Sequence, residues 1–261
     1  MLSKLLKYDL KKNMRWMWIL FVATIGLAGI TRAAKEIGES VAMFSVIAVF
    51  LEGVYYGLAV NIVLQPFLRN FLNLQKSFYS DEAYLTHTIP VTKNQLVNSK
   101  YLTAIIEIGL GFASLIASIL IMYAGPGFLN SIKFIISTIV NGSVSVAAVI
   151  IFVVALIIVE FLMFISIIYF AIVVAYKSKD KRLLRAFLIS AGCAMASLTV
   201  LFSIIMIVFA INGVKFTVST IVLSGEVFMS VLVTGIVVYL AAAVLFYFLT
   251  KREFNKGVNV D

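Results

Sequence analysis

Six long runs of hydrophobic residues dominate the pattern of apolar and polar positions along the chain. Each run approaches or exceeds the roughly 20 residues that a helix needs to cross a hydrocarbon core of about 30 Å. The runs lack the alternation of apolar and polar residues that membrane β-strands show, so we predict helices. The predicted spans cover residues 16–31, 41–64, 101–123, 144–176, 186–211 and 227–250.

The segment before the first run has the pattern of an amphipathic helix over residues 1–15. Its leucines fall on one helical face and its lysines on the opposite one, which is typical of a helix that lies in the membrane interface. Trp16 and Trp18 follow, where the chain is expected to turn into the first span. Asp9 falls within the apolar face. It either stays at headgroup level near Lys12 or pairs with a basic residue of another loop on the same side of the membrane.

Composition supports a membrane protein and excludes two other classes. Hydrophobic residues make up 62% of the 261 positions and charged residues 13%, and the mean hydropathy is +1.09. Soluble domains carry roughly 45–50% apolar and about 25% charged residues, and disordered chains have too few apolar residues to fold. The predicted fold is an all-α integral membrane protein. Its single transmembrane domain, 1–261, comprises the interfacial helix, a six-helix region over 16–250 and a tail over 251–261.

The lysines and arginines predict the orientation, because short loops rich in these residues stay in the cytoplasm. Of the 21, five precede the first span, four lie in 65–100, five in 177–185 and three follow the last span. Both termini are therefore expected in the cytoplasm. The net charge of +9 reflects this topology and, secondarily, attraction to anionic membrane lipid, and it does not indicate nucleic-acid binding. A cleaved signal peptide is disfavoured because Arg32 interrupts the expected cleavage site.

The chain lacks the motifs of several enzyme classes. No stretch reads G-x-x-x-x-G-K-[ST], so an ATP-driven process would need another polypeptide to hydrolyse the ATP. One histidine and one cysteine exclude a His/Cys zinc site. His87 falls in a predicted loop and Cys193 inside a span, which excludes a cysteine-histidine peptidase and favours Cys193 as a small buried hydrophobe. We predict that this chain is not an enzyme and has no catalytic, cofactor or metal site.

The longest polar stretch, residues 65–100, is the one sizeable loop predicted on the cytoplasmic side. Ser80 can cap a short helix that begins at Asp81, because acidic residues favour the positive end of the helix dipole. Thr92 and Gln95 have the spacing of a capping box, which predicts a second helix that leads into the third span.

This loop also resembles that of a known family. Residues 80–92, S-D-E-A-Y-L-T-H-T-I-P-V-T, followed by Leu96 and Lys100, are similar to the loop before the third span of bacterial ATP-binding-cassette (ABC) export permeases of the type-2 class. Residues 5–12, L-L-K-Y-D-L-K-K, resemble the opening of Gram-positive members. Ile89 stands where leucine is usual. The likeness in architecture extends over the whole chain.

The resemblance implies roles for several residues. In the family, this loop carries a coupling helix that docks on a separate nucleotide-binding ATPase subunit, which holds ATP and Mg. The corresponding docking residues are Asp81, Glu82, Tyr84, Leu85 and His87. A second cytoplasmic contact, or simply a solvated basic loop, is expected at Lys181, Arg182 and Arg185. Family permeases pair with a second copy or a paralogue, often through the first and fifth spans, whose small residues include Gly26, Gly29, Gly192 and Ala196.

Three acidic residues fall inside predicted spans: Glu52, Glu107 and Glu160. An ionised carboxylate facing lipid costs about 2.5 kcal/mol or more, so each should face protein or water. All three are candidates for a substrate path, although snorkelling to the interface is a sufficient explanation for Glu107. Glu52 and Glu160 are expected to lie deeper, without a basic residue at matching depth. They either form structural hydrogen bonds or line a route that favours cationic or amphipathic substrates.

The resemblance implies the permease subunit of an ATP-driven exporter in the bacterial plasma membrane, with amphipathic or antimicrobial peptides as the expected substrates. An ion-coupled secondary transporter that uses the intramembrane glutamates is one alternative. A membrane scaffold or sensor without transport activity is another. Two expected outer segments, 126–140 and 214–223, are unusually apolar and are predicted to lie along the outer membrane surface or to re-enter it.

Overall fold

The computed structural model describes residues 2–79, 83, 91–123, 125–141, 144–178, 181–214 and 223–256. These residues are almost entirely helical, and six of their helices are long and apolar enough to cross a membrane. The prediction of six apolar helices is confirmed. The six are α1 (Leu2–Gly38), α2 (Ala42–Tyr79), α4 (Lys93–Tyr123), α6 (Val146–Ala175), α7 (Arg182–Ile211) and α8 (Gly225–Asn255).

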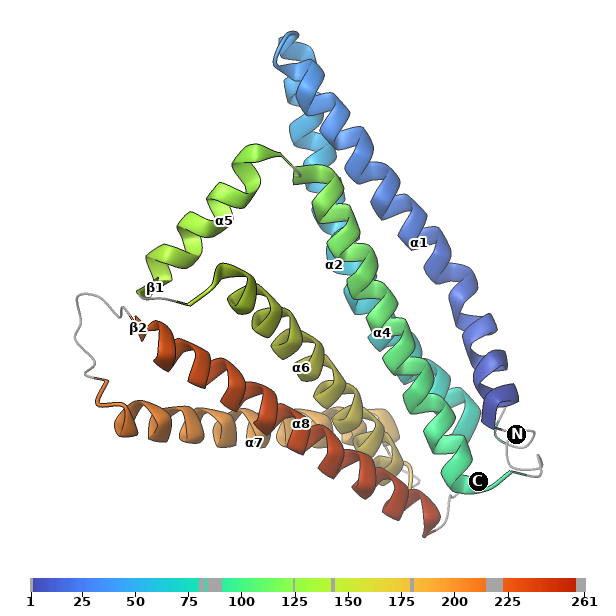
Figure 1. The fold of residues 1–261 in the computed structure, drawn as a ribbon. Coiled ribbons are helices and arrows are strands. Elements are labelled where there is room, and N and C mark those ends of the chain that lie inside the picture. The colour runs from blue at the N-terminus through green and yellow to red at the C-terminus, as the bar shows by residue number, and fades with distance from the viewer. Residues whose placement is uncertain are drawn as a thin grey trace. The chain divides into compact units, whose positions relative to one another are not determined.

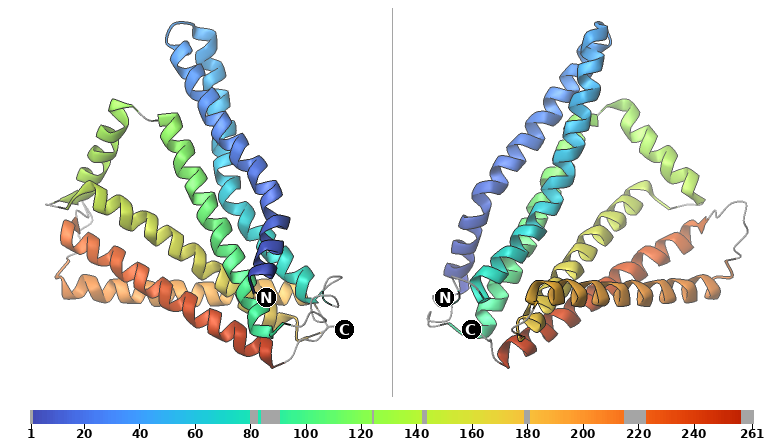
Figure 2. Two further views of the ribbon diagram at one scale, coloured as in Figure 1. Left: turned by 45° about the vertical axis from the view of Figure 1, so that its right-hand side comes forward. Right: turned by 180° about the vertical axis from the view of Figure 1, so that it is seen from behind.

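The helices form two compact units, Met1–Pro126 and Gly127–Asp261. In the first unit, α1 packs along both α2 and α4, and the three helices run side by side (Figure 1, Figure 2). In the second unit, α6 packs against α8 and α7.

The first helix differs from the sequence prediction, because α1 is one helix of 37 residues with no turn at Trp16 or Trp18. Its buried residues follow one another at intervals of three or four: Asn13, Met17, Phe21, Thr24, Ala28 and Thr31. This continuous inward stripe holds α1 against its neighbours through the point where the turn was expected. At 1.5 Å per residue, α1 is about 55 Å long and extends well beyond a hydrocarbon core of about 30 Å.

The middle of the first unit has an apolar core in which Met17 and Phe21 of α1 pack with Ile62 of α2. Gly111 lets α4 approach α2 closely, since a Cβ at this position would lie 3.1 Å from the carbonyl oxygen of Ile62. Pro66 follows Ile62 by one helical turn and has no N–H to donate to that carbonyl. The Ile62 carbonyl oxygen can therefore face the neighbouring helix.

The second unit has its own core, formed by Met163, Ile167, Tyr239 and Ala243. Two short strands, β1 (Val140–Asn141) and β2 (Leu223–Ser224), pair in parallel just before α6 and α8. Ser145 and Ser224 each accept a hydrogen bond from a backbone N–H in the first turn of the helix that follows, which explains where α6 and α8 begin.

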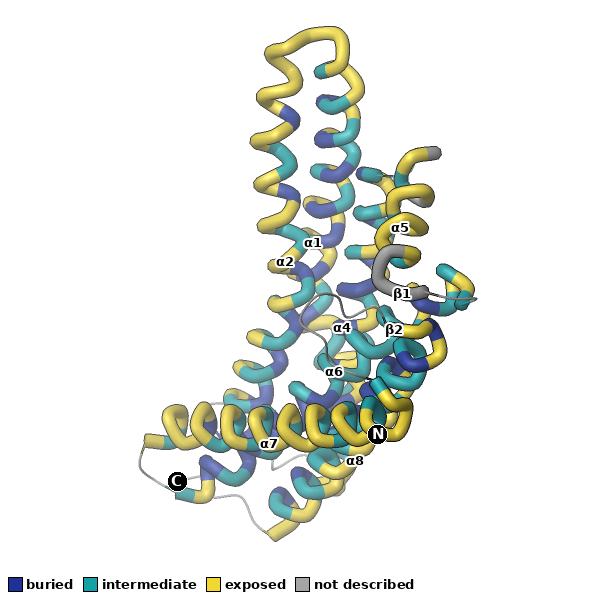
Figure 3. The backbone as a smooth tube through the Cα atoms, turned by 90° about the vertical axis from the view of Figure 1, so that its left-hand side faces the viewer, coloured by how far each residue is buried: buried dark blue, intermediate teal, exposed yellow. Residues whose placement is uncertain are grey.

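The two remaining helical elements are more exposed. Ala186 is the one buried residue of α7, which is coloured as exposed along much of its length in Figure 3. The first apolar outer segment forms α5 (Pro126–Ile139), whose 14 residues span about 21 Å, too short to cross the membrane. Most of the second segment, 214–223, lies outside the described residues.

Candidate functional site

Buried and half-buried polar side chains join the three helices of the first unit through two groups of hydrogen bonds, one around Glu107 and one around Lys100. They belong to Asp9 and Asn13 of α1, Asn70, Asn73 and Ser77 of α2, and Ser99, Lys100 and Glu107 of α4. We call these eight residues the buried polar network.

Glu107 accepts hydrogen bonds from both other helices. The side-chain amide of Asn13 donates to Oε1 over 2.6 Å, and that of Asn70 donates to Oε2 over 2.8 Å. Asn73 donates in turn to the side-chain oxygen of Asn13 over 2.7 Å. Glu107 is 0% exposed, so the expectation that it snorkels to the interface is wrong. Its burial is tolerated because both carboxylate oxygens have donors.

Lys100 and Asp9 form the charged part of the network. Lys100 Nζ lies 2.8 Å from Asp9 Oδ1, and the two side chains are 11% and 12% exposed. Lys100 also donates to the hydroxyl of Ser77 over 3.1 Å, and the hydroxyl of Ser99 donates to Asp9 Oδ2 over 3.4 Å. Of the two alternatives for Asp9, the contacts match pairing with a basic residue, although Lys100 lies in the second turn of α4 rather than in a loop.

Helical periodicity explains why these residues meet. Asp9 and Asn13 are four positions apart and Lys100 and Glu107 are seven apart, so each pair shares one helical face. The predicted capping box sets the start of α4: Thr92 Oγ1 accepts from the N–H of Gln95, and Gln95 Oε1 accepts from the N–H of Thr92, each over 3.3 Å. None of the three amides in the network was singled out by sequence reasoning. For the two amides on α2, Asn70 and Asn73, the available sequence signal was their spacing with Ser77, which places the three residues on one helical face.

A second polar cluster lies toward the opposite ends of the same helices. Glu52 Oε1 accepts from Lys35 over 2.9 Å, from Tyr56 over 2.9 Å and from Tyr123 over 2.7 Å. The expectation that Glu52 lies deep without a basic partner is wrong. The sequence pattern places Lys35 in a loop. In the structure Lys35 lies in the last turn of α1, and its side chain reaches Glu52 in the third turn of α2. Of the two alternatives for Glu52, the contacts match structural hydrogen bonding.

Glu160 differs from the other two glutamates. It lies half-buried on α6, within the second unit. Within the described part of the chain, its carboxylate forms no hydrogen bond and no ion pair. Glu52 and Glu107 therefore belong to two separate polar clusters of the first unit, and Glu160 belongs to the second unit.

The predicted docking residues Asp81, Glu82, Tyr84, Leu85 and His87 lie outside the described residues. The points where their segment joins the helices are described. Residue 80 follows Ser77 of α2 by three positions, and α4 reaches Lys100 eight positions after Thr92. The buried polar network thus lies at the base of residues 80–92.

The predicted second contact begins α7. Lys181 precedes the helix with a positive φ of 47°, the left-handed conformation. The guanidinium of Arg182 stacks on the ring of Tyr176 with 5.6 Å between the guanidinium carbon and the ring centroid, and its Nε donates to the carbonyl of Ser178 over 3.2 Å. Arg185 is exposed. Arg182 is thereby held against the end of α6, whereas Arg185 projects into solvent.

The four small residues predicted at a dimer interface remain uncovered within the chain. A Cβ added at Gly26, Gly29 or Gly192 would meet no atom within 4 Å. Ala196 is exposed one turn beyond Gly192 on α7. These positions leave room for another helix to approach closely.

The described residues contain no group of three or more His, Cys, Asp or Glu side chains that could hold a metal ion. Comparison of the chain with protein-family models, with curated proteins and with solved structures gives no match.

Proposed function

We propose that this chain is the permease subunit of an ATP-driven exporter and that a separate ATPase subunit docks on residues 80–92. The observation that carries the proposal is the buried polar network, which ties α1, α2 and α4 together at the base of that segment. The sequence resemblance of the segment to permease coupling loops supplies the identity of the partner.

Rigid-body coupling requires a loop that moves together with the helices it joins. A displacement of residues 80–92 would act on the end of α2, close to Ser77, and on the start of α4, close to Lys100. Lys100 and Ser77 are hydrogen-bonded to each other inside the bundle. The ion pair between Lys100 and Asp9 couples this movement to α1. Because buried polar groups are costly to separate from their partners, the three helices respond as one body.

We also propose an orientation in the membrane, a substrate class and an assembly for the chain. Seventeen of the 21 lysines and arginines fall on the side of residues 80–92, which favours a cytoplasmic location for both termini. Among the three glutamates of the predicted spans, Glu160 is the one without a hydrogen bond or ion pair in the described residues, and it favours a cationic or amphipathic substrate such as a peptide. The open glycines of α1 and α7 favour pairing with a second permease chain.

The test is purification of the tagged chain from its native host in mild detergent, followed by mass spectrometry of the proteins that accompany it. We expect a stoichiometric subunit with a P-loop sequence. Replacement of Asp81, Glu82, Tyr84 and Leu85 by alanine should remove that subunit. Glu36→Ala/Glu39→Ala is the matched control, since it removes two acidic residues at the opposite end of α1 and should leave the subunit bound.

A chain that purifies without any P-loop subunit would contradict the exporter proposal. In that case, ion-coupled transport would rest on Glu160 alone, because Glu52 and Glu107 already have hydrogen-bond donors.

A further inference from the structure

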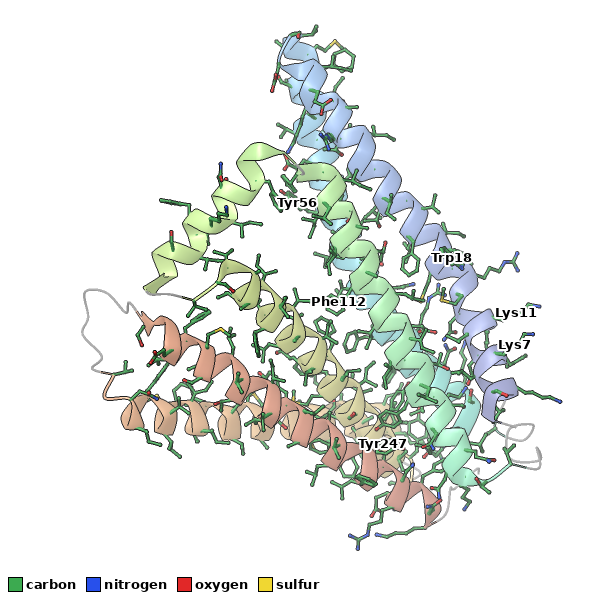
Figure 4. The ribbon with its side chains drawn as sticks, viewed as in Figure 1. Lys7, Lys11, Trp18, Tyr56, Phe112 and Tyr247 are labelled. Atoms are coloured by element: carbon green, nitrogen blue, oxygen red, sulfur yellow. The ribbon has the colours of Figure 1, made fainter. Side chains whose placement is uncertain are left out.

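A basic face runs along the first four turns of α1. Lys4, Lys7, Lys11 and Arg15 are all exposed, and at 100° per residue they fall within an arc of about 80°. Asp9 and Asn13 lie on the opposite side of the helix, where they join the buried polar network. Figure 4 shows Lys7 and Lys11 extending from α1 away from the other helices of its unit.

These four cations have no protein partner within the described part of the chain, where none of them forms a hydrogen bond or an ion pair. Like charges one turn apart on a helix repel each other and destabilise it. The face is therefore electrostatically complementary to a surface of negative charge.

The same face becomes apolar farther along the helix. At 100° per residue, Trp18 falls between Lys7 and Lys11 around the helix and is 57% exposed, and Val22, one turn later, is 68% exposed. Tryptophan is enriched where the headgroups meet the hydrocarbon core. Trp18 therefore marks the depth at which this face passes from headgroups to acyl chains.

The rise of the helix gives the depth of each cation. Measured along the axis from Trp18, Arg15 lies at about 5 Å, Lys11 at about 10 Å and Lys7 at about 16 Å. Screening at physiological salt acts over about 8 Å. Arg15 thus lies within one screening length of Trp18 and Lys11 slightly beyond it, whereas Lys7 and Lys4, at about 16 and 21 Å, lie two screening lengths or more away and should contribute less.

We propose that the face formed by Lys4, Lys7, Lys11, Arg15 and Trp18 binds the headgroups of anionic phospholipids. A phospholipid offers a phosphate to the cations and an acyl chain to Trp18 and Val22 on one side of one helix. An acidic protein surface would match only the first of these. The proposal does not depend on export or on an ATPase partner.

The chain contains two tryptophans, Trp18 on this face and Trp16 about 160° farther around the helix, so its fluorescence reports on the lipid around α1. The experiment reconstitutes the full chain in equimolar phosphatidylglycerol and phosphatidylcholine, with bromine on the acyl chains of one lipid or of the other. The ratio of the two quenching efficiencies gives the lipid preference around the tryptophans. We expect brominated phosphatidylglycerol to be preferred by about threefold or more, and the preference to disappear at high salt.

Variants locate the preference. Lys7→Gln/Lys11→Gln/Arg15→Gln should bring the ratio close to one, and Arg15→Gln alone should lower it more than Lys4→Gln. The matched control, Lys76→Gln/Lys133→Gln/Arg252→Gln, removes three exposed cations from other helices and should keep the ratio. Equal quenching by both lipids in the unmodified chain would overturn the proposal. So would an equal loss in the control variant, displacement by inorganic phosphate at matched ionic strength, or displacement by an acidic polypeptide.

Discussion

Lys100 and Asp9 lie 91 positions apart in the sequence, yet Lys100 Nζ and Asp9 Oδ1 are 2.8 Å apart inside the first unit. The pair connects the second turn of α4 to the second turn of α1. It also connects the helix that follows residues 80–92 to the amino-terminal segment of the chain. This contact holds the first turns of α1 against α4. A separate helix lying in the membrane interface, as the sequence predicts for residues 1–15, would not need such a contact.

The Asp9–Lys100 pair predicts a specific pattern of stability. Asp9→Leu or Lys100→Met alone leaves a buried charge without its partner and should cost about 3 kcal/mol or more. The double variant removes both charges and should cost clearly less than the sum of the two single changes. The midpoint of thermal unfolding in detergent, followed by circular dichroism, measures each variant. Lys76→Met, at an exposed position, should leave the midpoint unchanged, and strict additivity would contradict the buried pair.

Glu107 predicts sensitivity to an isosteric change. In E107Q the new amide group must face a donor of Asn13 or Asn70, so one hydrogen bond is replaced by a contact between two donors. We expect a loss of about 1–3 kcal/mol in unfolding free energy, with a larger loss for E107L, which removes the acceptor that the amides of Asn13 and Asn70 share. Glu39→Gln is the exposed control. A stability of E107Q equal to that of the unmodified chain would show that the two amides do not hold this carboxylate.

Two glycines in α4 form a matched pair. A Cβ at Gly111 would approach the Ile62 carbonyl oxygen to 3.1 Å, whereas a Cβ at Gly109 meets nothing within 4 Å. Gly109→Ala should be neutral or stabilising by up to about 1 kcal/mol, because alanine favours the helix. Gly111→Ala should be destabilising, because the neighbouring atom is backbone and cannot rotate away. Thermal unfolding of the two variants checks this, and equal midpoints would contradict the close approach of α4 to α2.

The proposed pairing of permease chains predicts a crosslink through α7. Cys193 packs against the core of the second unit, so it is first replaced by serine. In that background Gly192→Cys or Ala196→Cys should form a disulfide-linked dimer in membranes under mild oxidation. Phe202→Cys, which is exposed farther along α7, is the control for random collision. Equal crosslinking at all three positions would count against a specific interface.

The six helices were predictable because hydrophobic runs of membrane length leave few alternatives. Their ends were not, because polar residues continue the helices beyond the membrane. The predicted first span covered residues 16–31, but α1 extends from Leu2 to Gly38. Because α1 extends this far, Lys35 lies in a helix rather than in the predicted loop, and its side chain can pair with Glu52.

The buried polar network was predictable only in part. Asp9 could be singled out from the sequence because it is a charged residue on an otherwise apolar helical face. Pairing with a basic residue was one of the two alternatives for its side chain. Its partner could not be chosen, since contacts over 91 positions depend on how helices pack. Glu107 was misjudged because Asn13 and Asn70 are uncharged and give no sign, on their own helices, that they face another carboxylate.

The most direct measurement of the central claim is ATP hydrolysis by the protein purified from its native host. The chain has no P-loop sequence, and the proposal assigns ATP hydrolysis to a bound subunit. The account predicts Mg-dependent ATPase activity in the sample with the unmodified chain and none when residues 81–85 are replaced by alanine. A sample without ATPase activity, or one whose activity persists unchanged after that replacement, would contradict docking of an ATPase on residues 80–92.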